Sequence, residues 1–267
     1  MRFPIRPLVT PTPLGPAAFS GARPQRPLYI PAMDVVIAQP SPSKIQVLPH
    51  NQYHTTDALS PASVSPSPLE QFRAWFSDAV EGGNVHEPEA MSLSTATPSG
   101  IPSARIVLFK QLDDRGFVFF TNYTSRKSKE LLANPHAALV FYWREIHRSV
   151  RVLGKVEKID ARESEEYFKS RPVGSRLGAW ASKQSTVVGE GEVFARLDHL
   201  KERFGVDDYS EAADVPPPDF WGGWRVVPHE VEFWSGKPSR LHDRVRYLRE
   251  DGSTDEDPAW KIDRLAP

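Results

Sequence analysis

Apolar and polar positions alternate along much of the chain after residue 68, which predicts a mainly β structure. The strand-like runs are residues 91–97, 104–110, 116–122, 137–143, 149–159, 230–234, 241–248 and 260–265. Apolar residues at helical spacing predict helices at 68–81, 125–134, 161–170 and 190–204. Many antiparallel strands with a few peripheral helices favour a β-barrel of the α+β class.

Capping and turn residues set the bounds of several of these elements. Pro98, Ser99 and Gly100 separate two strand-like runs, so we expect a hairpin there. Ser67 is placed to cap the first helix, and Gly82-Gly83 is placed to end it.

Proline content divides the chain into parts. Eleven of the 26 prolines precede residue 50, and proline blocks helices, so residues 1–49 are expected to be a disordered tail. Four arginines precede the first acid, Asp34, so a mitochondrial targeting segment is an alternative, as is translation from Met33. Residues 50–67 are interpreted as an N-terminal arm and linker, and residues 68–267 as the barrel domain.

Composition excludes several classes of function. The chain has no cysteine, which excludes disulfides, thiolate nucleophiles and Cys-ligated metal sites. A net charge of −1 gives no overall attraction for nucleic acid or an anionic membrane, and no apolar run is long enough to span a bilayer. We therefore expect a soluble, cytoplasmic protein with neither of those partners, a mitochondrial location being the alternative that the basic tail allows.

The histidines predict no metal centre. His50 and His54 have the spacing of ligands on a helix, but they follow Pro49 in a loose segment and are interpreted as surface residues. No paired-carboxylate signature and no serine nucleophile motif is present. Chemistry at a site in this chain is therefore expected to depend on a bound organic cofactor.

The run Arg240-Leu241-His242-Asp243-Arg244 is the first candidate for ligand binding. In an extended strand Arg240, His242 and Arg244 share one face, where their charges repel each other unless an anion is present. Trp234 enters the turn that leads into this run and adds an aromatic plane. The combination suits a flat, anionic, aromatic ligand. The alternative is a solvated edge strand.

A second candidate lies between Arg105 and Lys110, which bracket an apolar run. Five positions separate the two cations, so regular alternation places them on opposite faces of a strand. They serve one site only if the strand bulges or if Lys110 lies at its end.

A third candidate follows Thr121, where a strand ends and a helix begins with Arg126 and Lys127. Free backbone N–H groups and two cations at a helix start make a phosphate cradle. Ordinary surface charge is the alternative.

A fourth candidate pairs Tyr167 and Arg171, which share a helix face, with Ser175 in the loop expected after Pro172. These groups suit a second phosphate. The alternative is pairing of Arg171 with Glu165 or Glu166 at the helix end.

Six segments of the chain, in order, resemble the pyridoxine/pyridoxamine 5'-phosphate oxidase family. They are RIVLFK (105–110), TNYTSRKSKE (121–130), YFKSRPVGSRLGAWASKQS (167–185), FWGGWRV (220–226), EFWSGKPSRLHDR (232–244) and AWKIDRLAP (259–267). The resemblance begins at about residue 68. It implies an FMN-binding split β-barrel with peripheral helices, FMN as cofactor, and a homodimer with the FMN site at the subunit interface.

The resemblance also implies roles for individual residues. The implied FMN contacts are Arg105, Ile106, Val107, Leu108, Lys110, Phe120, Thr121, Arg126, Lys127, Gln184, Ser185, Trp234 and Arg244. The implied contacts to the substrate phosphate are Lys110, Tyr167, Arg171 and Ser175. Arg240, Leu241 and His242 are implied to hold the substrate ring, with Arg240 and His242 as the catalytic pair.

Three positions depart from the family pattern. Ser149 stands where the family has a glutamine and is too short for a direct amide contact to the flavin. Phe120 replaces a tyrosine and loses a hydroxyl. Asn51-Gln52-Tyr53 stands where the family often has basic residues before a tyrosine, which affects any N-terminal lid.

The resemblance implies oxidation of pyridoxamine or pyridoxine 5'-phosphate to pyridoxal 5'-phosphate, with hydride transfer to FMN and reoxidation by dioxygen to give hydrogen peroxide. The alternatives are a split-barrel flavin reductase acting on another substrate and a non-catalytic carrier of a B6 phosphate or flavin.

Overall fold

The computed structural model describes residues 52, 53, 55, 57–207, 213–255 and 257–267. These residues belong to one unit, Gln52–Pro267. The predicted tail at 1–49 and the alternative start at Met33 lie outside the described residues. No helix in the described part is long and apolar enough to cross a membrane.

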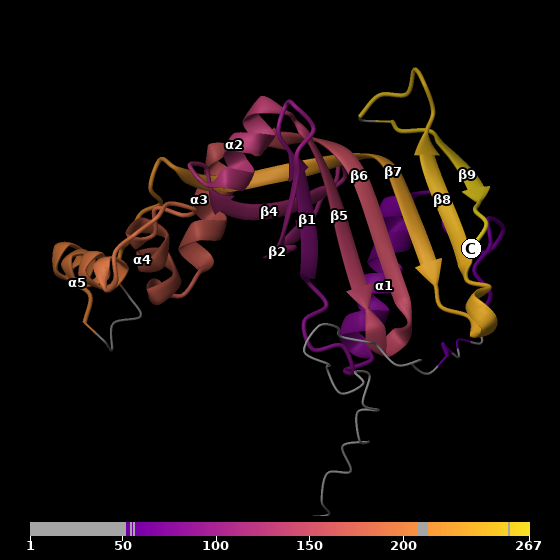
Figure 1. The fold of residues 1–267 in the computed structure, drawn as a ribbon, viewed down its shortest axis with the longest axis horizontal. Helices are drawn as coiled ribbons and strands as arrows, with labels where there is room; N and C mark the ends of the chain where they lie inside the picture. The colour runs from indigo at the N-terminus through magenta and orange to yellow at the C-terminus, as the bar shows by residue number, and fades with distance from the viewer. Residues whose placement is uncertain (1–51, 54, 56, 208–212, 256) are drawn as a thin grey trace, which may run out of the picture. The chain divides into compact units, whose positions relative to one another are not determined.

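The described unit is a nine-stranded antiparallel sheet with five α-helices, which confirms the predicted mainly β, α+β class (Figure 1). The strands are β1 (Ala90–Ala96), β2 (Pro102–Leu108), β3 (Gln111–Leu112), β4 (Phe117–Asn122), β5 (His136–Trp143), β6 (Arg148–Lys158), β7 (Trp221–Ser235), β8 (Asp243–Arg249) and β9 (Trp260–Arg264). The helices are α1 (Pro68–Glu81), α2 (Arg126–Ala133), α3 (Ala161–Ser170), α4 (Val173–Ala181) and α5 (Glu192–Phe204).

Strand β7 joins the two halves of the sheet. It is 15 residues long and pairs with β6 along nearly all of its length. On its other edge, the first part pairs with β4 and the last part with β8. The register with β6 shifts between Leu153 and Gly154, where a Cβ on Gly154 would lie 2.3 Å from the Val227 carbonyl oxygen. Only glycine permits this close approach of the two backbones.

Aromatic side chains form the core between α1 and the sheet. The ring of Phe72 on α1 lies 4.9 Å from those of both Phe117 and Phe141, and Trp75 lies 5.1 Å from Phe233. Figure 1 accordingly shows α1 against one face of the sheet. A separate apolar cluster joins α4 to α5 through residues that include Val173, Leu177 and Leu200.

The hairpin and the first helix form as the sequence predicts. The amide of Thr97 donates to the carbonyl of Ile101, and Gly100 takes a φ of 85° in the turn between β1 and β2. The first helix ends at Gly82-Gly83, as expected. Ser67 occupies the N-cap position, but its side chain makes no capping hydrogen bond.

Three expectations about element bounds were wrong. The strand predicted at 230–234 begins at Trp221, because Gly222 and Gly223 conceal the alternation from a pattern search. The strand predicted from Leu241 begins at Asp243, because residues 238–240 form a 3-10 turn. Ser175 lies in α4 and not in a loop, because Pro172 ends one helix and serves as the N-cap of the next.

We expect Phe72→Ala to reduce the free energy of unfolding by about 3–5 kcal/mol, because it removes the ring that joins α1 to β4 and β5. Val80→Ala, on the same helix but at a side chain 51% exposed, is the control and should change it by less than about 0.5 kcal/mol. Denaturant unfolding measures both. Equal effects would show that α1 does not depend on this contact.

Candidate active site

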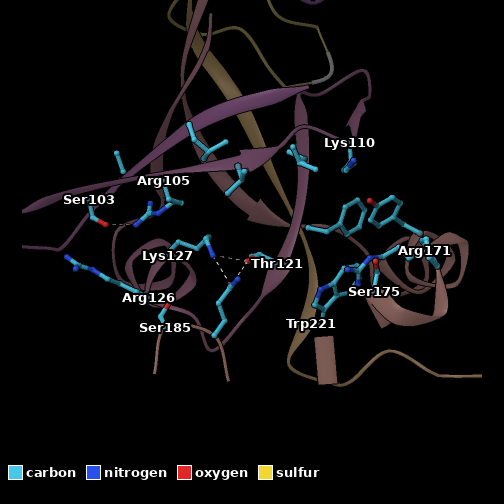
Figure 2. Close-up of a pocket in the computed structure, with 18 residues that line it drawn as sticks. Ser103, Arg105, Lys110, Thr121, Arg126, Lys127, Arg171, Ser175, Ser185 and Trp221 are labelled. Atoms are coloured by element: carbon cyan, nitrogen blue, oxygen red, sulfur yellow. Dashed lines mark hydrogen bonds between the residues drawn. The ribbon is translucent and has the colours of Figure 1, made fainter. Parts of the chain in front are cut away.

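A cavity of about 790 Å³, here called the first cavity, opens along β2 (Figure 2). Elements far apart in sequence line it: β2, β4, α2, the α3–α4 corner, the segment after α4 and the start of β7. It brings together fourteen predicted site residues, namely Arg105, Ile106, Val107, Leu108, Lys110, Phe120, Thr121, Arg126, Lys127, Tyr167, Arg171, Ser175, Gln184 and Ser185.

The two cations of the second candidate reach the same cavity because β2 ends before Lys110. Strand β2 pairs with β1 up to Leu108, after which the chain changes partner. The Phe109 amide donates to Glu89 beside β1, whereas the Lys110 amide donates to Val118 on β4. The change of partner cancels the alternation, as expected if Lys110 lies at the strand end.

One end of the first cavity, called the Lys127 end, is strongly cationic. Lys127 Nζ donates to Thr121 Oγ1 at 3.1 Å and to Gln184 Oε1 at 2.8 Å. Burial, and next the charge of Arg105, lower the pKa of Lys127 to about 8. A buried ammonium with neutral hydrogen-bond partners only is poised to bind an anion, which would restore its ordinary pKa.

Glu130 organises the arginines at the Lys127 end. Its carboxylate lies 2.8 Å from Arg126 Nε and 3.4 Å from Arg105 Nη2, and it also accepts from Thr95. Burial alone would raise the pKa of Glu130, but the hydrogen bonds from Thr95 and Arg126 and the charges of both arginines outweigh it and lower that pKa. Glu130 therefore remains ionised and fixes both arginines beside Lys127.

The opposite end, called the Arg171 end, carries Lys110, Tyr167, Arg171 and Ser175. The Nη1 atom of Arg171 is buried without a hydrogen-bond partner, and burial lowers the pKa of this residue. Figure 2 shows Arg171 and Ser175 on the side of the cavity opposite Arg105 and Lys127. An unpaired, desolvated guanidinium beside a hydroxyl is a second place for an anion.

The predicted alternative partners of Arg171 bind elsewhere. Glu165 pairs with Lys169 at 2.7 Å, and Glu166 lies 4.0 Å from Arg162. Pairing of Arg171 at the helix end, the alternative that the sequence left open, is therefore wrong.

The predicted residues Trp234 and Arg244 line a second cavity of about 370 Å³. Arg244 Nε lies 2.7 Å from Glu232 Oε1, and Glu232 also pairs with Arg151 at 2.7 Å. Burial would raise the pKa of Glu232, but its hydrogen bonds to the two arginines lower it. The two cavities share no lining residue. Trp221 lines the first cavity and Trp234 the second, and the two lie near opposite ends of β7, which spans at most about 44 Å between them.

The expectation that Arg240, His242 and Arg244 share one strand face was wrong, because β8 begins at Asp243 and neither Arg240 nor His242 lies in it. Arg240 lies in the 3-10 turn with a φ of 61°, so strand alternation does not extend to it. Arg240 and Leu241 are exposed and line neither cavity. The ring of His242 packs against that of Trp234, with the ring centroids 4.6 Å apart.

The protonation of His242 follows from its contacts. Its Nδ1 atom accepts from the Lys237 amide at 3.0 Å, which leaves Nε2 as the N–H donor. Burial, and next the charge of Arg240, lower the pKa of His242. The imidazole is therefore held neutral, with one defined donor.

Two of the departures have structural consequences. Ser149 Oγ donates to the Phe141 carbonyl oxygen at 2.9 Å, so its hydroxyl is bonded within the sheet. Phe120 stacks on Tyr167, with ring centroids 3.9 Å apart. Phe120 therefore packs through its ring alone, and this stacking does not require the hydroxyl that a tyrosine would bring.

Sequence reasoning missed several lining residues. In the first cavity these are Ser103, Ala104, Pro172 and Trp221; in the second they are Val140, Tyr142, Arg151 and Glu232. Tyr53 and Ser149, two of the positions that depart from the family pattern, also line the second cavity. Trp221 stands in the FWGGWRV segment, where two glycines beside a large aromatic residue were a usable signal of close packing. Within the described residues no group of His, Asp and Glu could hold a metal ion.

Two family models match the chain end to end from residue 77. The model described as pyridoxamine 5'-phosphate oxidase matches residues 77–221, and the one described as the pyridoxine 5'-phosphate oxidase C-terminal dimerisation region matches residues 221–267. The first alone covers more than half of the chain. The chain belongs to the pyridoxamine 5'-phosphate oxidase family.

Individual relatives agree with this assignment. Pyridoxine/pyridoxamine 5'-phosphate oxidase 1 of Ralstonia nicotianae is 53% identical over 79% of this chain and 93% of its own length. The pyridoxine/pyridoxamine 5'-phosphate oxidase of Salinibacter ruber is 51% identical over 81% of this chain and 96% of its own.

Solved structures share the fold. PhzG of Burkholderia lata 383, in complex with tetrahydrophenazine-1-carboxylic acid, has a TM-score of 0.70 and 32% identity over 79% of this chain and 98% of that one. A pyridoxamine 5'-phosphate oxidase-related, FMN-binding protein of Nostoc punctiforme has a TM-score of 0.58 and 16% identity, covering 76% of this chain and 99% of that one.

Membership of this family confirms the predicted FMN-binding split β-barrel and makes the chain an FMN-dependent oxidase. The match to a dimerisation region supports a homodimer. The residues of the first cavity fit the cofactor, because the buried Lys127 with Arg105 and Arg126 beside it matches a phosphate, and an apolar strand borders the space beyond.

We expect FMN binding to the apoprotein to weaken as the pH rises above about 8, because Lys127 then loses its proton and its charge. Fluorescence titration of FMN across pH 7–10 measures this. Lys127→Met should bind FMN weakly and lose the dependence near pH 8. Lys129→Met, at an exposed lysine of the same helix, should keep it. An unchanged dependence in Lys127→Met would assign the titration to another group.

Proposed function

We propose that this chain oxidises pyridoxamine 5'-phosphate and pyridoxine 5'-phosphate to pyridoxal 5'-phosphate. The observation that carries the proposal is the pair of separate anion-binding ends in one cavity: Lys127 with its neutral partners, and Arg171 with its unpartnered Nη1 atom. FMN and a B6 phosphate each bring one phosphate, of roughly two negative charges near pH 7. Two such anions need two separate cationic ends.

The geometry of the first cavity supports a division of its residues between cofactor and substrate. The Lys127 end, with Arg105, Arg126 and Thr121, would hold the FMN phosphate. Tyr167, Arg171, Ser175 and Lys110 would hold the substrate phosphate. Ile106 and Leu108, on the strand between the two ends, are 69% and 40% exposed and offer an apolar surface to a flat ring.

A second copy of the chain would complete the site. Trp234 and Arg244 line the second cavity, at the far end of β7, so one chain does not bring them to the first cavity. In the dimer that the C-terminal region supports, the second copy would supply Trp234 and Arg244 to the flavin. The same copy would supply Arg240, Leu241 and His242 to the substrate ring, since these residues precede Arg244 directly.

FMN, when bound, would supply the two-electron acceptor for the hydride from C4′ of the substrate, and dioxygen would take those electrons to give hydrogen peroxide. The residues of this chain bind and orient. His242, neutral with its proton on Nε2, would donate a hydrogen bond to the substrate ring, and Arg240 would cover that ring with its planar cation. The oxidised amine would hydrolyse to the aldehyde with loss of ammonia, whereas the alcohol would give the aldehyde directly.

Turnover by the FMN-loaded protein tests the function. On addition of pyridoxamine 5'-phosphate we expect stoichiometric hydrogen peroxide and the absorbance of a pyridoxal Schiff base. Binding without either product would favour a carrier, and reduction of the bound flavin by a substrate other than a B6 phosphate would favour a reductase. Preference for a reduced phenazine carboxylate, the class of ligand bound to PhzG, would replace the B6 substrate altogether.

The proposed division of labour predicts two groups of variants. Arg240→Ala and His242→Ala should reduce kcat/KM by about 100-fold, as expected for loss of substrate orientation, and change FMN affinity little. Arg126→Ala and Arg244→Ala should weaken FMN binding by about tenfold or more, because each removes a charged hydrogen bond. Steady-state kinetics and FMN titration separate the groups. Equal effects of all four on FMN binding would contradict the division.

A further inference from the structure

Arg171 is supported by aromatic rings. No carboxylate among the described residues forms an ion pair with it. Its guanidinium carbon lies 5.0 Å from the Trp221 ring centroid and 5.5 Å from that of Phe168. A guanidinium over a ring face is held by the electrons of the ring, while its in-plane N–H groups stay available.

The ring of Trp221 is itself fixed on several sides. It stacks nearly parallel to Phe120, with an interplanar angle of 11°, and to Tyr167, with an angle of 9°. Phe168 meets it edge-on at 4.8 Å. Trp221 is 8% exposed, and it lines the first cavity (Figure 2). The tryptophan is a rigid platform with one face towards the cation.

The neighbouring glycines make this stack possible. A Cβ on Gly223 would lie 2.4 Å from Ile159 Cδ1 and 3.0 Å from Phe120 Cε1. Strand β7 therefore lies close enough to β4 for Phe120 and Trp221 to stack. The segment FWGGWRV places one tryptophan at the start of the strand and leaves the space beside it free.

Arg225, in contrast to Arg171, is an arginine that stabilises the fold. It lies 2.6 Å from Asp113 and 2.7 Å from Glu157. Burial would lower the pKa of Arg225, but its hydrogen bonds to these carboxylates raise it. Burial lowers the pKa of Arg171 without such compensation. A carboxylate beside Arg171 would compete with a phosphate, whereas a tryptophan does not.

We propose that Trp221 is a positioning residue for substrate: it holds the Arg171 guanidinium in place, without neutralising it, for the phosphate of the B6 vitamer. The inference rests on the proposed function. It gives the physical reason why the Arg171 end would prefer a substrate that carries a phosphate ester. Trp221 acts through Arg171, so its contribution should disappear when Arg171 is removed.

The test measures binding of inorganic phosphate and of pyridoxal 5'-phosphate to the FMN-loaded protein by calorimetry. We expect Trp221→Leu to weaken both about tenfold, which corresponds to ~1.4 kcal/mol. Trp221→Phe keeps a smaller ring face and should weaken them only about threefold. In the Arg171→Ala background, Trp221→Leu should weaken binding of both ligands by less than a further twofold.

Kinetics and a matched control separate positioning from stability. Trp221→Leu should raise the KM for pyridoxamine 5'-phosphate about tenfold and leave kcat within about twofold. Trp260→Leu removes another tryptophan that carries an arginine, Arg249, over its ring, and should leave phosphate binding unchanged. If Trp221→Leu does not fold, the same measurements are made on Trp221→Phe, alone and combined with Arg171→Ala.

Two outcomes overturn the inference. One is unchanged phosphate binding in both Trp221 variants. The other is that Trp221→Leu weakens phosphate binding as much in the Arg171→Ala background as it does when Arg171 is present. Because binding needs no turnover, the two proposals fail separately. A protein that binds phosphate through Trp221 and Arg171 but oxidises no B6 phosphate refutes the proposed function alone.

Discussion

The path of β7 is the constraint on which the rest of this structure depends. One strand of 15 residues pairs with β6 on one edge and with β4 and then β8 on the other. That path includes a register shift against β6 at Gly154, where the two backbones approach too closely for any side chain. It fixes Trp221 in the first cavity and Trp234 in the second, at opposite ends of the same strand. A site that needs both residues is therefore complete only with a second copy of the chain, which agrees with the dimerisation region at the C-terminus.

Lys127 and Arg171 differ in their surroundings from the cations that are paired with carboxylates. Arg225 and Arg151 are compensated by carboxylates and stabilise the sheet. Lys127 has only neutral partners, and Arg171 has aromatic rings. Burying a charge without compensation costs free energy, so such groups are retained where a ligand supplies the opposite charge. This difference in surroundings, and not the number of basic residues, is what marks the first cavity as a site for two anions.

Much of the site could be predicted from local patterns, and the exceptions have physical causes. Tyr167 lies in the last turn of α3 and Arg171 directly follows that helix, so both reach the cavity as their spacing predicts. Arg105 and Lys110 reach it only because the chain changes strand partner between them, which spacing does not reveal. Arg240 departs from strand geometry because the 3-10 turn after Pro238 extends over it, so its alternation with His242 is lost.

By itself, the sequence determined the class of the fold, the family, the cofactor and most of the residues that line the first cavity, because these depend on local periodicity and on contiguous motifs. Only the tertiary structure decided that Trp234 and Arg244 lie apart from that cavity, that Glu130 fixes the arginines at the Lys127 end, and that Trp221 supports Arg171. These features join residues that are distant along the chain. They follow from the register of β7 and from packing between elements, which no short segment encodes.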